Sequence, residues 1–86
     1  MKDLSIILSG PDARSVDMAA RLILDTARLT GNEVRGPIPI PIPAGPAAER
    51  TIRARRRMDI VAPNPRMMPE LQLLGLPTTV DVTFGP

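Results

Sequence analysis

The chain has 86 residues, which is enough for one domain whose core buries roughly 60 to 65% of the unfolded surface. It contains no cysteine and no histidine, which excludes disulfides, thiol nucleophiles and histidine general bases. The net charge is only +2, but Lys2 is the single lysine and all other basic residues are arginines. The amino terminus has no leader pattern and no run of about 18 apolar residues occurs, so we expect a cytoplasmic protein without membrane partners.

The first part of the chain predicts a strand followed by an amphipathic helix. Apolar residues alternate with polar ones over much of 4–9, which is typical of a half-buried strand. Asp12 is placed to cap a helix over 13–30, and Gly31 is a natural stop for it. The expected core stripe of that helix has spacings of three and four and consists of Val16, Ala19, Ala20, Ile23 and Ala27.

The segment 34–43 alternates proline and isoleucine from Pro37 onward. In an extended strand, alternate amides point to the same edge, so these prolines leave one edge of the strand without donors. The segment can therefore pair with one neighbouring strand only, which predicts a sheet edge, unless it forms a polyproline II stretch. The three isoleucines, Ile38, Ile40 and Ile42, would share one face of the strand.

The remaining sequence predicts a turn at 44–48, a strand over 51–61, a helix and a last strand over 79–84. Asn64 and Pro65 favour the start of the helix, and Pro69 makes it short or kinked. In the strand over 51–61, one face carries Ile52, Ala54, Met58 and Ile60, with Arg56 intruding among them. The opposite face is mostly basic and carries Arg53, Arg55, Arg57 and Asp59.

The order strand, helix, strand, strand, helix, strand predicts an α+β fold of the ferredoxin-like βαββαβ plan over a single domain, residues 1–86. In that plan a four-stranded antiparallel sheet carries two helices on one face. The second strand of the plan lies at a sheet edge. The proline pattern predicts the same position independently.

Several segments resemble one family of ribosomal proteins. They are Val34-Arg35-Gly36-Pro37-Ile38-Pro39-Ile40-Pro41, the preceding residues 26–31, Met58-Asp59-Ile60-Val61-Ala62-Pro63, and Val80-Asp81-Val82. In this order they resemble the tenth protein of the small ribosomal subunit (ribosomal protein S-ten), known in transcription as NusE. The long basic hairpin of that family is reduced here to about residues 42–50.

The resemblance implies the same fold and a structural role without catalysis or cofactor. Family members bind small-subunit ribosomal RNA and neighbouring ribosomal proteins, and they pair with NusB in transcription antitermination. We therefore expect a ribosomal protein of the cytoplasm. The alternative is a loop-shortened interaction module, natural or engineered, that binds NusB or self-associates off the ribosome.

The arginines are the candidate RNA contacts. A planar guanidinium donates hydrogen bonds in a fork that suits phosphate, and most of these arginines fall within 50–66. Phe84 is the single aromatic residue, which argues against reading bases by stacking. A solvated basic face that aids solubility is the alternative. The expected RNA-binding residues are Arg35, Arg50, Arg53, Arg55, Arg56, Arg57 and Arg66.

The first helix carries a second apolar line, formed by Met18, Leu22 and Leu29, on a face away from Val16. This line predicts a surface for a NusB-like helical protein or for a second copy of the chain. Scattered surface apolar residues are the alternative. Asp12 and Asp17 fit capping and surface roles better than a catalytic carboxylate pair. We predict no enzyme activity, no metal site and no cofactor.

Overall fold

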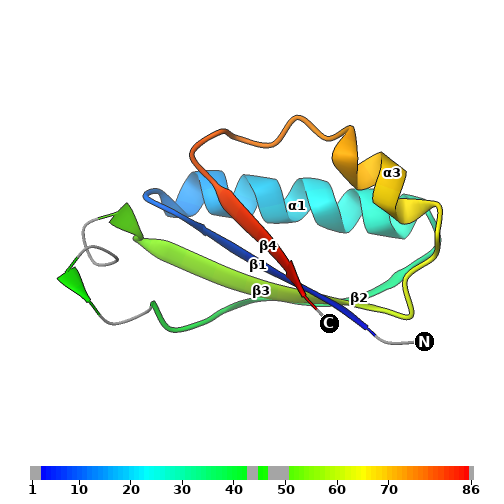
Figure 1. The fold of residues 1–86 in the computed structure, drawn as a ribbon, viewed down its shortest axis with the longest axis horizontal. Helices are drawn as coiled ribbons and strands as arrows, with labels where there is room; N and C mark the ends of the chain where they lie inside the picture. The colour runs from blue at the N-terminus through cyan, green and yellow to red at the C-terminus, as the bar shows by residue number, and fades with distance from the viewer. Residues whose placement is uncertain (1–2, 43–44, 47–50, 86) are drawn as a thin grey trace.

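The computed structural model of the protein describes residues 3–42, 45–46 and 51–85. Its elements, in chain order, are β1 (Leu4–Gly10), α1 (Ala13–Leu29), β2 (Glu33–Pro39), β3 (Ala54–Val61), α3 (Met67–Gln72) and β4 (Asp81–Gly85). The strands form one antiparallel sheet in the order β2-β3-β1-β4. Both helices lie on the same side of this sheet (Figure 1). The predicted α+β, ferredoxin-like arrangement is thus confirmed.

Helix α1 begins and ends through specific backbone contacts. The Asp12 carboxylate accepts hydrogen bonds from the amides of Arg14 and Ser15, so Asp12 is the predicted cap. A further hydrogen bond from the Ser15 hydroxyl is the main cause that lowers the pKa of Asp12. At the other end Gly31 has a φ of +81°, which turns the chain out of the helix.

The core lies between α1 and the sheet, with α3 covering one end. All five residues of the predicted α1 stripe are buried. They face alternate residues of the two central strands, because residues on one side of a strand repeat with a period of two. The buried apolar side chains contributed by the strands, by α3 and by the segment before β4 are those of Ile6, Leu8, Ala54, Met58, Ile60, Met67, Leu71 and Val80.

Strand β2 lies at the edge of the sheet, as the proline pattern predicts. The Ile40 amide donates to the Arg55 carbonyl at 3.1 Å, on the side toward β3. The register shifts within β2: Arg35 is opposite Asp59, whereas Ile38 is opposite Arg57. Gly36 and Pro37 therefore share one partner residue, which is a β-bulge. Because side chains alternate, this bulge moves Ile38 off the face occupied by Val34.

Several element boundaries differ from those predicted. Strand β2 ends at Pro39, so Ile40, Pro41 and Ile42 follow the strand instead of belonging to it. Strand β3 begins at Ala54 rather than at Thr51, and β4 begins at Asp81 after a turn that Val80 closes with Pro77. Helix α3 begins at Met67, because Asn64 first closes a turn through its side chain and its carbonyl. The helix is short, as predicted. Of the predicted turn at 44–48, only residues 45 and 46 lie within the described residues.

Asn32 joins the end of α1 to the loop before α3. Its buried side chain donates to the carbonyl of Ala27 at 3.1 Å and to the hydroxyl of Thr30 at 2.8 Å. The side-chain oxygen of Asn32 accepts a 2.7 Å hydrogen bond from the backbone amide of Asn64. One amide side chain thus satisfies backbone groups in two distant segments, which holds the loop against the helix.

Candidate functional site

The side of the sheet opposite α1 forms an open face with charged and polar side chains. Ser5 is opposite Asp59, Ile7 is opposite Arg57, and Ser9 is opposite Arg55. These residues alternate with the buried residues of β1 and β3, so they point away from the helices. We call this surface the open sheet face. It is the basic outer face that the sequence predicts for the strand over 51–61.

Arg57 lies at the centre of a hydrogen-bonded group on the open sheet face. Its Nη2 donates to the Asp59 Oδ1 at 3.3 Å and to the Ser5 Oγ at 3.2 Å. The Ser5 hydroxyl in turn donates to the same Asp59 oxygen at 2.7 Å. This last bond is the main cause that lowers the pKa of Asp59, and Arg57 and Arg35 lower it further. The ionised form of Asp59 is therefore favoured, and its carboxylate occupies part of the Arg57 guanidinium.

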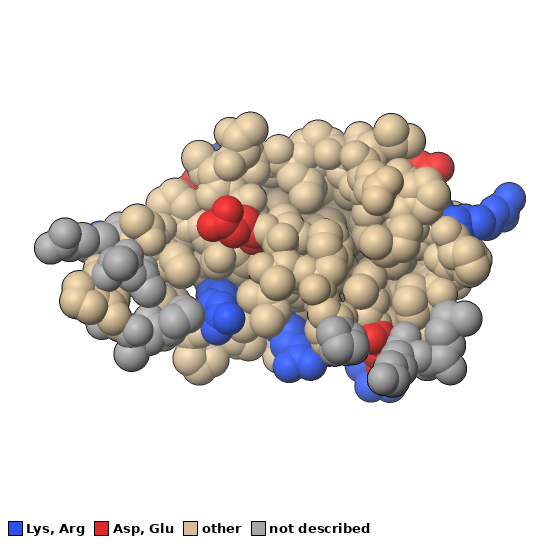
Figure 2. Space-filling model, in the orientation of Figure 1, with Lys and Arg blue, Asp and Glu red and all other residues tan. Residues whose placement is uncertain are grey.

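Arg35 and Arg55 flank this group on the same face. Arg35 is directly opposite Asp59 across β2 and β3. Arg55 extends from β3 toward the edge of the sheet, where its Nη1 donates to the Pro41 carbonyl at 3.0 Å. Figure 2 shows basic side chains spaced along the margin of the molecule where β3 and β2 run in Figure 1. Three of the predicted RNA-binding residues, Arg35, Arg55 and Arg57, thus share the open sheet face.

Of the other predicted arginines, Arg56 and Arg66 lie away from the open sheet face. Arg56 points to the helix side of the sheet, where its Nε donates to the Asp17 carboxylate of α1 at 3.1 Å. Arg66 is at the start of α3, away from the open sheet face. Arg53 is exposed just before β3, where its amide donates to the Gly10 carbonyl at 2.8 Å. Arg50 lies outside the described residues.

Two isoleucines, one in β2 and one just after it, lie beside the arginines of the open sheet face. Ile38 is opposite Arg57 and remains 53% exposed. Ile40, bonded to the Arg55 carbonyl, lies on the same face and is half-buried. The sequence pattern predicts that the isoleucines share a face, but it does not place them beside the arginines. The bulge in β2 places the isoleucines beside the arginines. Its one signal in the sequence is the glycine at position 36, because the φ of +91° found there is a conformation that favours glycine.

The predicted partner residues form a line on the outer surface of α1. Leu29 is 87% exposed and Met18 is 54% exposed, whereas Leu22 is only partly exposed. These residues lie on α1, which packs on the side of the sheet opposite the open sheet face and its arginines. The two candidate surfaces are therefore separate.

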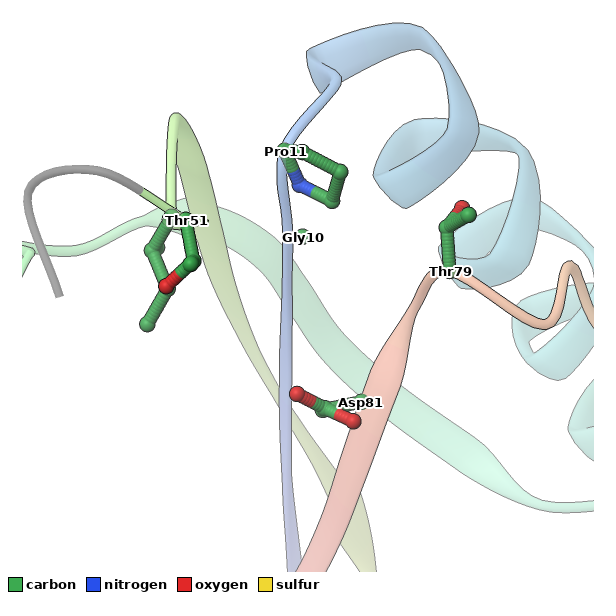
Figure 3. A pocket seen from close by; sticks show the side chains of 6 residues that line it. Gly10, Pro11, Thr51, Thr79 and Asp81 are labelled. Carbon is green, nitrogen blue, oxygen red and sulfur yellow. The ribbon is translucent and has the colours of Figure 1, made fainter. Parts of the chain in front are cut away.

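A shallow pocket of about 450 Å³ lies where β1 ends and the segments before β3 and β4 approach it (Figure 3). It is lined by Gly10, Pro11, Thr51, Ile52, Thr79 and Asp81. Its polar side chains are those of Thr51, Thr79 and Asp81, and the Asp81 carboxylate can accept hydrogen bonds from a ligand. Within the described part of the chain, no group of three or more acidic residues is placed to hold a metal ion. None of the predicted site residues that the structure describes lines this pocket.

The fold and the open sheet face define the protein as a small ferredoxin-like module with arginines on the uncovered face of its sheet. No protein-family model matches the chain. Among the residues that the structure describes, no helix is both long enough and apolar enough to cross a membrane.

Proposed function

We propose that this protein is a noncatalytic, ribosomal-protein-like module that binds structured RNA through the open sheet face. The observation that carries the proposal is the placement of Arg35, Arg55 and Arg57 on one uncovered face of the sheet. The ordered resemblance of the sequence to the tenth small-subunit ribosomal protein supports the same assignment. On this proposal the protein works in the cytoplasm, in contact with small-subunit ribosomal RNA and neighbouring ribosomal proteins.

Phosphates rather than bases are the expected RNA contacts. Guanidinium groups bind phosphate oxygens through paired hydrogen bonds, and such contacts position a protein without reading sequence. The open sheet face presents arginines and isoleucines but no aromatic ring on which a base could stack. Recognition then depends on the shape of the folded RNA, which presents phosphates at spacings that match the arginines.

Salt dependence of RNA binding tests this proposal. A fluorescently labelled fragment of small-subunit head RNA is titrated with the protein at several salt concentrations, and anisotropy gives Kd. With three phosphate contacts, we expect log Kd to rise with log salt with a slope of roughly 2 to 3. Binding that ignores salt, or the absence of binding at low salt, would reject RNA binding by this face.

A pair of variants localises the contact. The double variant R55A/R57A removes two cations from the open sheet face, and we expect a loss of affinity of about tenfold or more at low salt. The control is Arg21→Ala, which removes an exposed cation from α1 where it pairs with Asp25. An equal loss per charge in the control would mean that net charge, and not this face, drives binding.

A second candidate function rests on the exposed line of Met18 and Leu29 on α1. It is a protein-binding module that pairs with NusB, or with a second copy through α1, either in transcription antitermination or off the ribosome. The test is capture of purified NusB by the chain, compared with the variant Leu29→Ser. The matched control is Leu73→Ser, which changes an exposed leucine outside α1. A monomeric chain that does not retain NusB contradicts this function.

A further inference from the structure

The two edges of the sheet differ in their capacity to pair with another strand. The β2 edge carries Pro37 and Pro39, which have no amide hydrogen to donate. The β4 edge, Asp81–Gly85, contains no proline, and no further strand lies beyond it among the described residues. An unpaired strand of this kind presents main-chain donors and acceptors to another chain. The β4 edge is therefore the more open of the two edges to strand addition.

Apolar side chains accompany the β4 edge on the helix side of the sheet. Val82 is opposite Leu8 and Phe84 is opposite Ile6, so both belong to the face that α1 and α3 cover. They line an apolar pocket of about 240 Å³ together with Met68, Leu71, Gln72 and Leu76. Phe84 nevertheless remains 45% exposed. A strand added at β4 would cover this ring, which is the largest apolar group at that edge.

We propose that two copies of this chain pair antiparallel through β4, centred on Thr83. This register places Asp81 opposite the partner's Gly85 and Val82 opposite the partner's Phe84, and it uses all five residues of the strand. No charge is opposite a like charge, because Asp81 is the only charged residue in β4. The two copies keep their helices on the same side, since residues of even number remain on one face across the pair.

The proline edge explains why association stops at two copies. A contact between β4 of one copy and β2 of the next would leave each copy with a further free edge and would build a filament. The prolines of β2 block that contact, so the isologous β4 pair is the one that remains. The contact is small, involving five residues of each strand and the side chains around Phe84. Because it buries less than the roughly 800 Å² per partner of a standard interface, we expect a Kd in the micromolar range or weaker.

Sedimentation equilibrium over a wide concentration range tests the dimer. We expect the apparent mass to rise from the monomer mass of 9.3 kDa toward twice that value and no further. Thr83→Lys or Thr83→Glu places like charges opposite each other at the centre of the pair, and we expect dimerisation to weaken by about fivefold. An equimolar mixture of the two variants restores association, because the charges are then complementary. Thr78→Lys, an exposed position before β4, is the control and leaves the dimer unchanged.

Three results would overturn the proposal. One is a mass that stays monomeric at millimolar concentration. Another is growth beyond the dimer. The third is a dimer that persists equally in both Thr83 variants but dissociates in Leu29→Ser, which would place the contact on α1. The proposal does not depend on RNA binding, and failure of the RNA titrations leaves it unaffected.

Discussion

Arg56 of β3 donates to Asp17 of α1, with 3.1 Å between Nε and Oδ1, while its neighbours Arg55 and Arg57 point to the other side of the sheet. The Arg56 side chain is only 21% exposed, and Asp17 is 56% exposed. An arginine inside the apolar alternation of β3 is thus accommodated by an acidic residue on the helix that covers it. The pair fixes the helix to the sheet rather than serving the open sheet face.

The Arg56–Asp17 pair should contribute measurably to stability. We expect a double-mutant cycle of Arg56→Ala and Asp17→Ala to give a coupling energy of about 0.5 to 1 kcal/mol, because one partner is mostly buried. The exposed pair of Arg21 and Asp25 serves as comparison and should give about 0.3 kcal/mol. Urea unfolding of the variants measures both values. Equal couplings would show that burial of Arg56 adds nothing.

Gly36→Ala should destabilise the protein strongly. Gly36 has a φ of +91°, and an added Cβ would lie 2.7 Å from the Arg57 carbonyl oxygen. The backbone must shift to relieve this contact, and we expect a loss of about 2 kcal/mol or more in the free energy of unfolding. Gly75→Ala is the control, since an added Cβ there has no heavy atom within 4 Å. Similar thermal midpoints for the two variants would contradict the strained bulge.

Asn32→Ala should cost more than an ordinary surface substitution. It removes hydrogen bonds to Ala27, Thr30 and Asn64 and leaves the Asn64 amide without this partner. The expected loss in the free energy of unfolding is about 2 kcal/mol. Gln72→Ala, at an exposed position of α3, should change it by less than about 0.5 kcal/mol. Chemical denaturation compares the two, and a neutral Asn32→Ala would show that water replaces the lost bonds.

Ser5→Ala should raise the pKa of Asp59 toward its ordinary value of 3.8, because the Ser5 hydrogen bond is the main cause of the lowered pKa. A carboxylate with a lowered folded pKa stabilises the protein above its unfolded pKa, and this stability is lost as pH falls through the folded pKa. Ser5→Ala should therefore reduce the part of the free energy of unfolding that is lost as the pH falls. Carboxyl NMR titration measures the change. Asp12, held by Ser15, should titrate as before, and an unchanged Asp59 would refute the assignment.

Asp59→Asn should strengthen RNA binding if the proposed function holds. Asp59 occupies the Arg57 guanidinium, and removing its charge frees that group for phosphate. We expect a gain in affinity of about threefold to tenfold at low salt. The control is Asp25→Asn, which makes the same charge change on α1. Anisotropy titrations compare the variants. An equal gain in both would indicate a general charge effect.

Much of the fold could be predicted from local pattern. The α1 stripe, the Asp12 cap and the edge position of β2 were all predicted correctly. Each depends on residues close together in the chain, where periodicity and missing amide donors act directly. The starts of β3, α3 and β4 were displaced by a few residues. Before α3 and β4 the reason is a turn closed by specific hydrogen bonds, such as those of Asn64 and Val80.

The sequence by itself determined a ferredoxin-like domain with arginines on an outer strand face and a donor-poor edge. Only the tertiary structure decided which side chains share the open sheet face. The bulge at Gly36 brings Ile38 beside Arg57, whereas strict alternation would have placed it with Val34. The tertiary structure also places Arg66 at the start of α3, away from the open sheet face, and pairs Arg57 with Asp59. The physical reason is that register and bulges arise from pairing between distant strands, whereas side-chain alternation is a property of each strand alone.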